Sequence, residues 1–192
     1  HSNSNNFQLD QLYFRMRKQP TPESRAGWGA TVVLGTSADT QISLDDNTGD
    51  QPFLFEAYAA YLADIGSGVK VVAGRYATPV GAESFLVDES WQITRGLLWT
   101  LQPVSHTGAF TSGGLGEGIS WQIGAANSDG NTMSDSDSEP TFVGSLGYQM
   151  DTVGLKLNGV YGGDANDLLG AATTFGLVGT CNPPAVPCTQ PT

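Results

Sequence analysis

The stretch that decides the fold covers residues 142–161 and reads FVGSLGYQMDTVGLKLNGVY. In its first half, Phe142, Leu146 and Tyr148 alternate with Ser145 and other small residues. The second half repeats the pattern, because bulky apolar residues at every second position alternate with a lysine and an asparagine. Successive side chains of a β-strand point to opposite faces. We therefore predict two strands here, each with one apolar face and one small or polar face.

The same alternation recurs along most of the chain, whereas the residue spacing of amphipathic helices is nearly absent. Besides 142–148 and 155–161, we predict strands over residues 7–17, 28–35, 53–63, 69–76, 106–114 and 121–125, and a weaker one over 173–180. This pattern is typical of an all-β fold.

The alternation also assigns side chains to faces. The predicted polar face includes Arg15, Glu56, Tyr58, Arg75 and Lys156. The predicted apolar face includes Phe53, Phe55, Val72 and Tyr76. Aromatic residues near strand ends fit the girdles that flank the apolar band of a membrane barrel, and these are Tyr13, Trp28, Phe53, Tyr61, Tyr76, Tyr148 and Tyr161.

Composition narrows the class of protein. The chain has 192 residues, of which 8 are Lys or Arg and 19 are Asp or Glu, so its net charge is −11. Such a chain lacks the basic surface that binds nucleic acid. Only 14% of residues are charged, against about 25% in typical soluble domains. Because no apolar run approaches the length of about 18 residues that suggests a membrane helix, a soluble β domain or a membrane β-barrel remains.

The links between predicted strands alternate in length. The short links are 64–68, 115–118 and 149–152, with 18–27 somewhat longer, and the long links are 39–52, 79–105, 127–140 and 162–172. Tight turns at one rim and extended loops at the other are typical of an up-and-down outer-membrane barrel. The polar face is rich in Gly, Ser, Thr, Gln and Asn, which suits the lining of a water-filled lumen better than a dry core.

Several runs resemble a known family. They are QLDQLYF at residues 8–14, GTSAD at 35–39, EAY at 56–58, AGRYATPVGAE at 73–83, TRG at 94–96 and SHTG at 105–108. In order and spacing over residues 7–163 they resemble the OmpL-like β-barrel porins of Gram-negative outer membranes. The resemblance implies an antiparallel transmembrane β-barrel of the bacterial cell outer membrane that forms a water-filled channel without catalysis or cofactor.

The resemblance also implies which partners the protein has and how much of a barrel this chain covers. Outer-membrane lipid, small hydrophilic solutes and a homo-oligomer such as a trimer are the expected partners. Members of that family are longer than this chain, so we expect a portion of a larger barrel. In this interpretation residues 1–163 supply barrel strands and long extracellular loops, and residues 164–192 supply a further loop and strand.

The link 79–105 is long for a loop without function, and its apolar content predicts that it folds into the lumen as a constriction element. The charges that it offers to solutes are Glu83, Asp88, Glu89 and Arg95, which face the polar-face residues named above. Opposite charges across a narrow aqueous pore orient polar solutes. An alternative, compatible with the first, is that these ions pair with each other to hold the loop.

The predicted extracellular loops are acidic, and carboxylates at a pore mouth attract cations. The residues are Asp39, Asp45, Asp46, Asp50, Asp129, Asp135, Asp137, Glu139, Asp164 and Asp167. We therefore expect a cation preference. The run at 135–139 has oxygen ligands that suit calcium, but it lacks the glycine and bidentate glutamate of a calcium-binding loop, so we predict no metal site.

The two cysteines, Cys181 and Cys188, flank a segment with three prolines. A short-loop disulfide, and with it an oxidising compartment, is one interpretation. Two free thiols are the alternative. Their spacing fits no zinc site.

An enzyme is not expected, because His1 and His106 are the only histidines and no Gly-x-Ser-x-Gly motif occurs. The competing hypothesis is a secreted or surface-layer β-sandwich that binds a partner through acidic, calcium-dependent loops. That domain would be soluble without detergent.

Overall fold

The computed structural model describes residues 7, 9–38, 52–81, 83–90, 94–96, 99, 103–127, 140–150 and 153–161, and the backbone of 172–179. The strands are β1 (Leu12–Lys18), β2 (Ala26–Leu34), β3 (Phe53–Ala63), β4 (Val69–Ala77), β5 (Ser105–Gly116), β6 (Ile119–Ala126), β7 (Thr141–Gln149), β8 (Val153–Tyr161) and β9 (Ala172–Gly179). A short 3-10 helix, η1 (Val87–Glu89), lies between β4 and β5.

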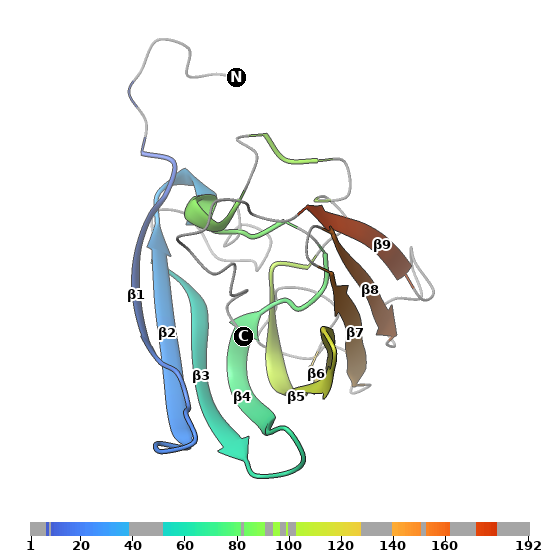
Figure 1. Ribbon diagram of the computed structural model, residues 1–192. Helices are drawn as coiled ribbons and strands as arrows, with labels where there is room; N and C mark the ends of the chain where they lie inside the picture. The colour runs from blue at the N-terminus through green and yellow to red at the C-terminus, as the bar shows by residue number, and fades with distance from the viewer. Residues whose placement is uncertain are drawn as a thin grey trace.

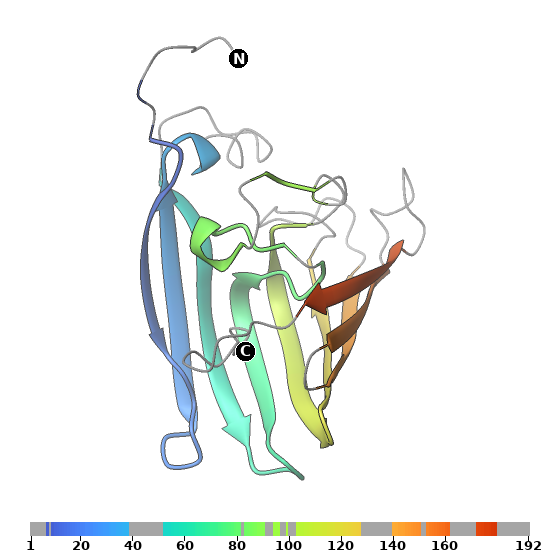
Figure 2. The same ribbon diagram turned by 45° about the horizontal axis from the view of Figure 1, so that its top comes forward.

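The strands form one antiparallel sheet in which each strand pairs with its neighbours in the chain. Figures 1 and 2 show this sheet as a curved wall with a concave and a convex side. Among the described strands, β1 pairs only with β2 and β9 only with β8, so the sheet does not close. The predicted all-β, up-and-down architecture is confirmed, and the predicted strand over 53–63 matches β3 at both ends.

The turns after β1, β3 and β5 lie at one edge of the sheet, and η1 lies near the opposite edge (Figure 1). The turn after β5 runs through Gly116, Glu117 and Gly118, which all have positive φ, at 87°, 46° and 80°. Such tight left-handed turns reverse a strand in few residues. The short-turn edge predicted from the sequence is therefore present, whereas most of the predicted long links lie outside the described residues.

Bulky apolar side chains cover the convex side. Phe14 is 64% exposed, Ile123 59% and Tyr161 70%. The other large apolar residues of this face include Met16, Trp28, Tyr61, Phe142, Leu146, Tyr148, Leu155 and Leu157. Their neighbours in sequence point to the concave side, as the alternating burial of β1 and β2 shows. Within the described residues, no helix is long and apolar enough to span a membrane.

The predicted orientation of Phe53 and Phe55 is wrong. Both side chains are buried on the concave side, at 4% and 1% exposure. The register between β2 and β3 passes from the pair Thr31 with Glu56 to the pair Val32 with Leu54, and thus skips Phe55. A β-bulge of this kind adds one residue to one strand and reverses the alternation beyond it.

The predicted outward orientation of Val72 and Tyr76 is also wrong. Val72 and Tyr76 pack on the concave side with Ala60, Tyr58 and Phe110. Val72 and Tyr76 look inward although they are apolar, so the rule that apolar side chains face outward fails locally. The predicted aromatic girdle accordingly loses three members, since the side chain of Tyr13, like those of Phe53 and Tyr76, lies on the concave side.

Close packing on the concave side depends on Gly29 of β2. A Cβ at this position would lie 2.6 Å from the hydroxyl oxygen of Tyr58, so the tyrosine ring lies flat over the glycine. Gly74 is under a similar constraint, because a Cβ there would lie 2.9 Å from the Cα of Tyr58 and the residue has φ of +126°. Gly29 therefore makes room for an aromatic side chain, and Gly74 for the close approach of the β3 backbone.

We predict that Gly29→Val lowers the free energy of unfolding by about 1–3 kcal/mol, because an added side chain in a packed site forces its neighbours to move. Gly159→Val is the matched control, since nothing lies within 4 Å of a Cβ at Gly159. Thermal unfolding of both variants in detergent measures the difference. Equal melting temperatures would contradict the packing described here.

Candidate functional site

The described residues between β4 and β5 pack against the concave side of the sheet, and we call these residues (78–81, 83–90, 94–96, 99, 103 and 104) the inner loop. Near its start, Val80 packs with Ala126, Val143 and Val160 of β6, β7 and β8. Figure 2 shows the loop between the two ends of the curved sheet. The start of the inner loop is therefore attached to the half of the sheet that contains the later strands.

The middle of the inner loop packs against the earlier strands. Phe85 and Leu86 are 6% and 0% exposed and form a cluster with Val33, Phe53 and Phe55. The Phe55 and Phe85 ring centroids are 5.1 Å apart. The inner loop thus spans the concave side from β8 to β2, and the bulge in β3 supplies an additional aromatic side chain for it to pack against.

Hydrogen bonds fix the start of the loop. The Oγ1 of Thr78 lies 3.0 Å from Nε2 of His106 and accepts a hydrogen bond from the backbone N–H of Val80 at 3.1 Å. His106 is 1% exposed. In this position the histidine holds the beginning of the inner loop.

Strand β1 and the residues before it hold the region around η1. Arg15 donates a hydrogen bond to Glu89 Oε1 at 2.7 Å, with the two side chains 18% and 22% exposed. The side chain of Gln11 donates to the carbonyl of Phe85 at 3.2 Å and accepts from the backbone N–H of Val87 at 3.0 Å. These three bonds connect residues more than 70 positions apart in the chain.

The charged side chains of Arg95 and Glu83 form hydrogen bonds with other residues of the inner loop. Arg95 donates to the Phe85 carbonyl at 2.8 Å and to Ser90 Oγ at 2.7 Å, and its guanidinium carbon lies 4.1 Å from the centre of the Trp99 ring. The Glu83 carboxylate accepts the backbone N–H of Gly96 at 3.0 Å. Burial lowers the pKa of Arg95, while the Glu83 carboxylate opposes that shift, and a guanidinium stays charged throughout.

Asp88 and Glu89 lie in the first turn of η1. Asp88 lies within electrostatic range of the Tyr13 hydroxyl. Glu89 also accepts a hydrogen bond from Ser84 Oγ at 2.7 Å. The loop charges predicted as candidates therefore make specific contacts that hold the loop in place.

Glu56 is the carboxylate of the concave face of β3, and it is 3% exposed. It accepts hydrogen bonds from Arg17 at 2.8 and 3.0 Å and from Thr31 Oγ1 at 2.6 Å. A buried carboxylate is tolerated when charge-assisted hydrogen bonds of this kind satisfy it. Tyr58, the next residue on this face, lies within electrostatic range of both Glu56 and Arg17.

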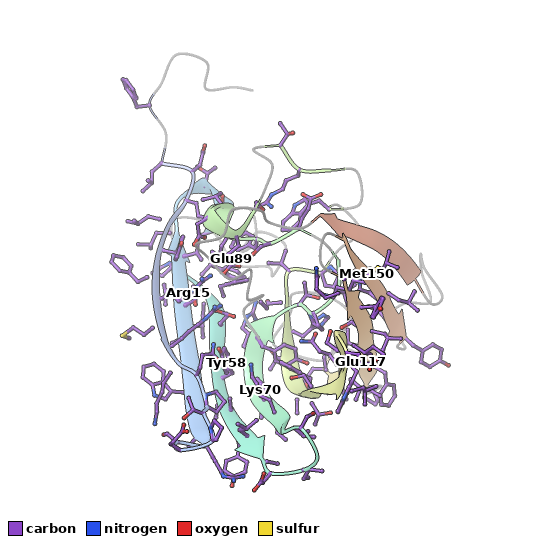
Figure 3. The ribbon with its side chains drawn as sticks, viewed as in Figure 1. Arg15, Tyr58, Lys70, Glu89, Glu117 and Met150 are labelled. Atoms are coloured by element: carbon purple, nitrogen blue, oxygen red, sulfur yellow. The ribbon has the colours of Figure 1, made fainter. Side chains whose placement is uncertain are left out.

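The remaining predicted residues also lie on the concave side. Figure 3 shows Arg15, Tyr58 and Lys70 there, with Glu89 beside Arg15. The guanidinium carbon of Arg75 lies 5.2 Å from the centre of the Phe53 ring, and Arg75 is 4% exposed. Lys156 is half-buried on the concave face of β8.

Two concave-side cations were not among the predicted site residues. Arg17 shares its face with Arg15, so the alternation within β1 could have identified it. Lys70 is 9% exposed and shares its face with Val72. It was missed because Val72 and Tyr76 were assigned to the outer side.

Some sequence predictions lie outside the described residues. They concern the disulfide between Cys181 and Cys188 and all ten loop carboxylates from Asp39 to Asp167. Within the described ranges, no three His, Cys, Asp or Glu side chains come together where they could hold a metal ion.

The chain matches the family described as "Putative beta-barrel porin-2, OmpL-like" over residues 1–181. It belongs to this porin family. No curated protein and no solved structure was found that matches the chain. The resemblance predicted from the sequence is thus confirmed, and so is the all-β, antiparallel β-barrel class, with the described sheet open rather than closed.

Membership places this porin among channel proteins of outer membranes in general. It also explains the two faces of the sheet. An apolar convex side and a concave side that carries the charged and polar strand residues fit a transmembrane β-barrel with an aqueous interior.

We predict that Leu86→Ala weakens the attachment of the inner loop by about 2–5 kcal/mol, the usual cost of removing a fully buried leucine side chain. Val87→Ala is the matched control, because the adjacent Val87 is 57% exposed. Amide hydrogen exchange of residues 83–90 in detergent should become faster in Leu86→Ala and stay unchanged in Val87→Ala. Equal exchange in both variants would show that the cluster does not hold the loop.

Proposed function

We propose that this porin forms a water-filled channel of the bacterial outer membrane for the passive diffusion of small hydrophilic solutes and ions. The observation that carries the proposal is the polar concave side crossed by an attached inner loop. Arg15, Glu56 and Lys70 on this side would be costly in a dry core. Protein donors satisfy the buried Glu56, whereas water in a lumen can reach Arg15, whose side chain is 18% exposed.

A row of neutral polar residues supports an aqueous lumen. Ser112 of β5, Gln122 of β6, Ser145 of β7 and Asn158 of β8 are successive partners in the strand register, and we call them the polar row. Ser145 Oγ donates to Gln122 Oε1 at 3.3 Å. Asn158 is 3% exposed, and within the described residues its Oδ1 is buried without a hydrogen-bond partner.

The competing β-sandwich receives no support from the observed arrangement. A sandwich requires a second sheet that packs over one face of the first. The described strands form a single sheet, and the inner loop is what packs against its concave side.

In the proposed channel, the inner loop narrows the lumen. The lining residues are Arg15, Glu56, Tyr58, Arg75 and Lys156 from the strands and Glu83, Asp88, Glu89 and Arg95 from the loop. The ion pair between Arg15 and Glu89 both holds the loop and places opposite charges at the narrowing. The cation preference stays a prediction, because it rests on loop carboxylates outside the described residues.

Reconstitution of the full-length protein tests the proposal. In planar lipid bilayers it should produce stepwise ion conductance, and in liposomes it should admit small sugars but exclude large ones. The folded protein should also migrate differently on a gel before and after boiling. A protein that is folded by this criterion and yet conducts no ions would contradict the proposed function.

We predict that Glu89→Gln increases movement of the inner loop, because it removes one partner of a part-buried ion pair. A loss of about 1 kcal/mol of attachment corresponds to a roughly fivefold larger population of detached loop. Asp64→Asn is the matched control, since it breaks the pair of Arg25 with an exposed carboxylate at a turn. Single-channel recordings should show more frequent changes of conductance level in Glu89→Gln alone, and the same behaviour in both variants would contradict a role for this pair.

A further inference from the structure

The concave side of the described strands carries more cations than anions. Its charged residues are the cations Arg15, Arg17, Lys70, Arg75 and Lys156 and the carboxylate Glu56. This excess is opposite in sign to the net charge of −11 of the whole chain. The wall of the lumen therefore differs in charge from the remainder of the protein.

The arginines are already engaged. Arg15 pairs with Glu89, and Arg17 pairs with Glu56. Arg75 stacks on Phe53 and has a further interaction within the chain. These side chains have fixed partners in the fold.

The two lysines differ from the arginines. In the part of the chain that the structure describes, the ammonium groups of Lys70 and Lys156 make no hydrogen bond and no ion pair. Lys70 lies within electrostatic range of Arg17 and Glu56, but that carboxylate is already satisfied by Arg17 and Thr31. A buried charge without a counter-ion is unfavourable, so each ammonium favours an anion from solution.

The positions of the lysines put both charges in the same section of the lumen. Lys70 is the second residue of β4 and Lys156 the fourth of β8, and both strands begin at the short-turn edge. In the strand register Lys70 is opposite Ser112, the first residue of the polar row, and Lys156 lies two residues before Asn158, the last. The two ammonium groups thus flank a row of neutral hydrogen-bonding side chains.

We propose that Lys70, Lys156 and the polar row form a path for small anions, such as carboxylates and phosphates, through the section of the lumen near the short turns. This inference rests on the proposed channel function. Fixed charges in a narrow aqueous passage with low-dielectric walls concentrate counter-ions. A lysine ammonium acts as a mobile point charge rather than a bidentate clamp, which suits passage better than tight binding.

The experiment measures the reversal potential of the full-length protein in planar bilayers under a potassium chloride gradient. Opposite to the cation preference expected from the loop carboxylates, the wild-type channel should pass chloride in preference to potassium. In the double variant Lys70→Gln with Lys156→Gln, the ratio of chloride to potassium permeability should fall by about twofold or more, because two wall charges are gone. Replacing both lysines with glutamate should reverse the preference.

Lys18→Gln is the matched control, since it removes one positive charge from an exposed residue at the end of β1. It should leave the permeability ratio unchanged. The boiling shift on a gel verifies that each variant is folded. A conducting wild-type channel that prefers potassium, or a ratio unaffected in the glutamine and glutamate double variants, would overturn the anion path and leave the channel proposal intact. A folded wild-type protein without conductance would overturn both.

Discussion

The whole arrangement depends on the continuous antiparallel ladder from β1 to β9. In hydrocarbon no water is available to the backbone, so each N–H and C=O within the membrane must find a partner in a neighbouring strand. Once the ladder is formed, the alternation of side chains lets one face of the sheet contact lipid and the other contact water. Phe14, Ile123 and Leu157 can face lipid because their neighbours Arg15, Gln122 and Lys156 face the other way.

The inner loop packs against the sheet where the alternation of inward and outward side chains is broken. The bulge at Phe55 adds an aromatic side chain to the concave side, and Phe85 and Leu86 pack against it. Ion pairing then orients η1, since Glu89 meets Arg15 on β1. Apolar contacts thus supply the attachment of the inner loop and charged contacts its orientation, while Lys70 and its polar neighbours belong to the proposed anion path.

Sequence alone predicted every described strand, because period-two alternation is a direct consequence of strand geometry. It predicted the concave position of Arg15, Glu56 and Lys156 for the same reason. It failed for Phe55, where an extra residue in one strand leaves no signal in composition. Lys70 was missed for a different reason, because its neighbours on that face are apolar and a polar interior was assumed. The contacts between the inner loop and β1 join residues far apart in the chain, and no local pattern encodes them.

The most direct test asks which side of the sheet meets water. In a background without the two native cysteines, single variants Gln122→Cys and Ile123→Cys place a thiol on the concave and convex sides of β6. With the protein in lipid vesicles, a membrane-impermeant maleimide should label Gln122→Cys, while Ile123→Cys should resist it and contact spin-labelled lipid. Labelling of Ile123→Cys with protection of Gln122→Cys, or equal labelling of both, would contradict an aqueous concave side and a lipid-facing convex side.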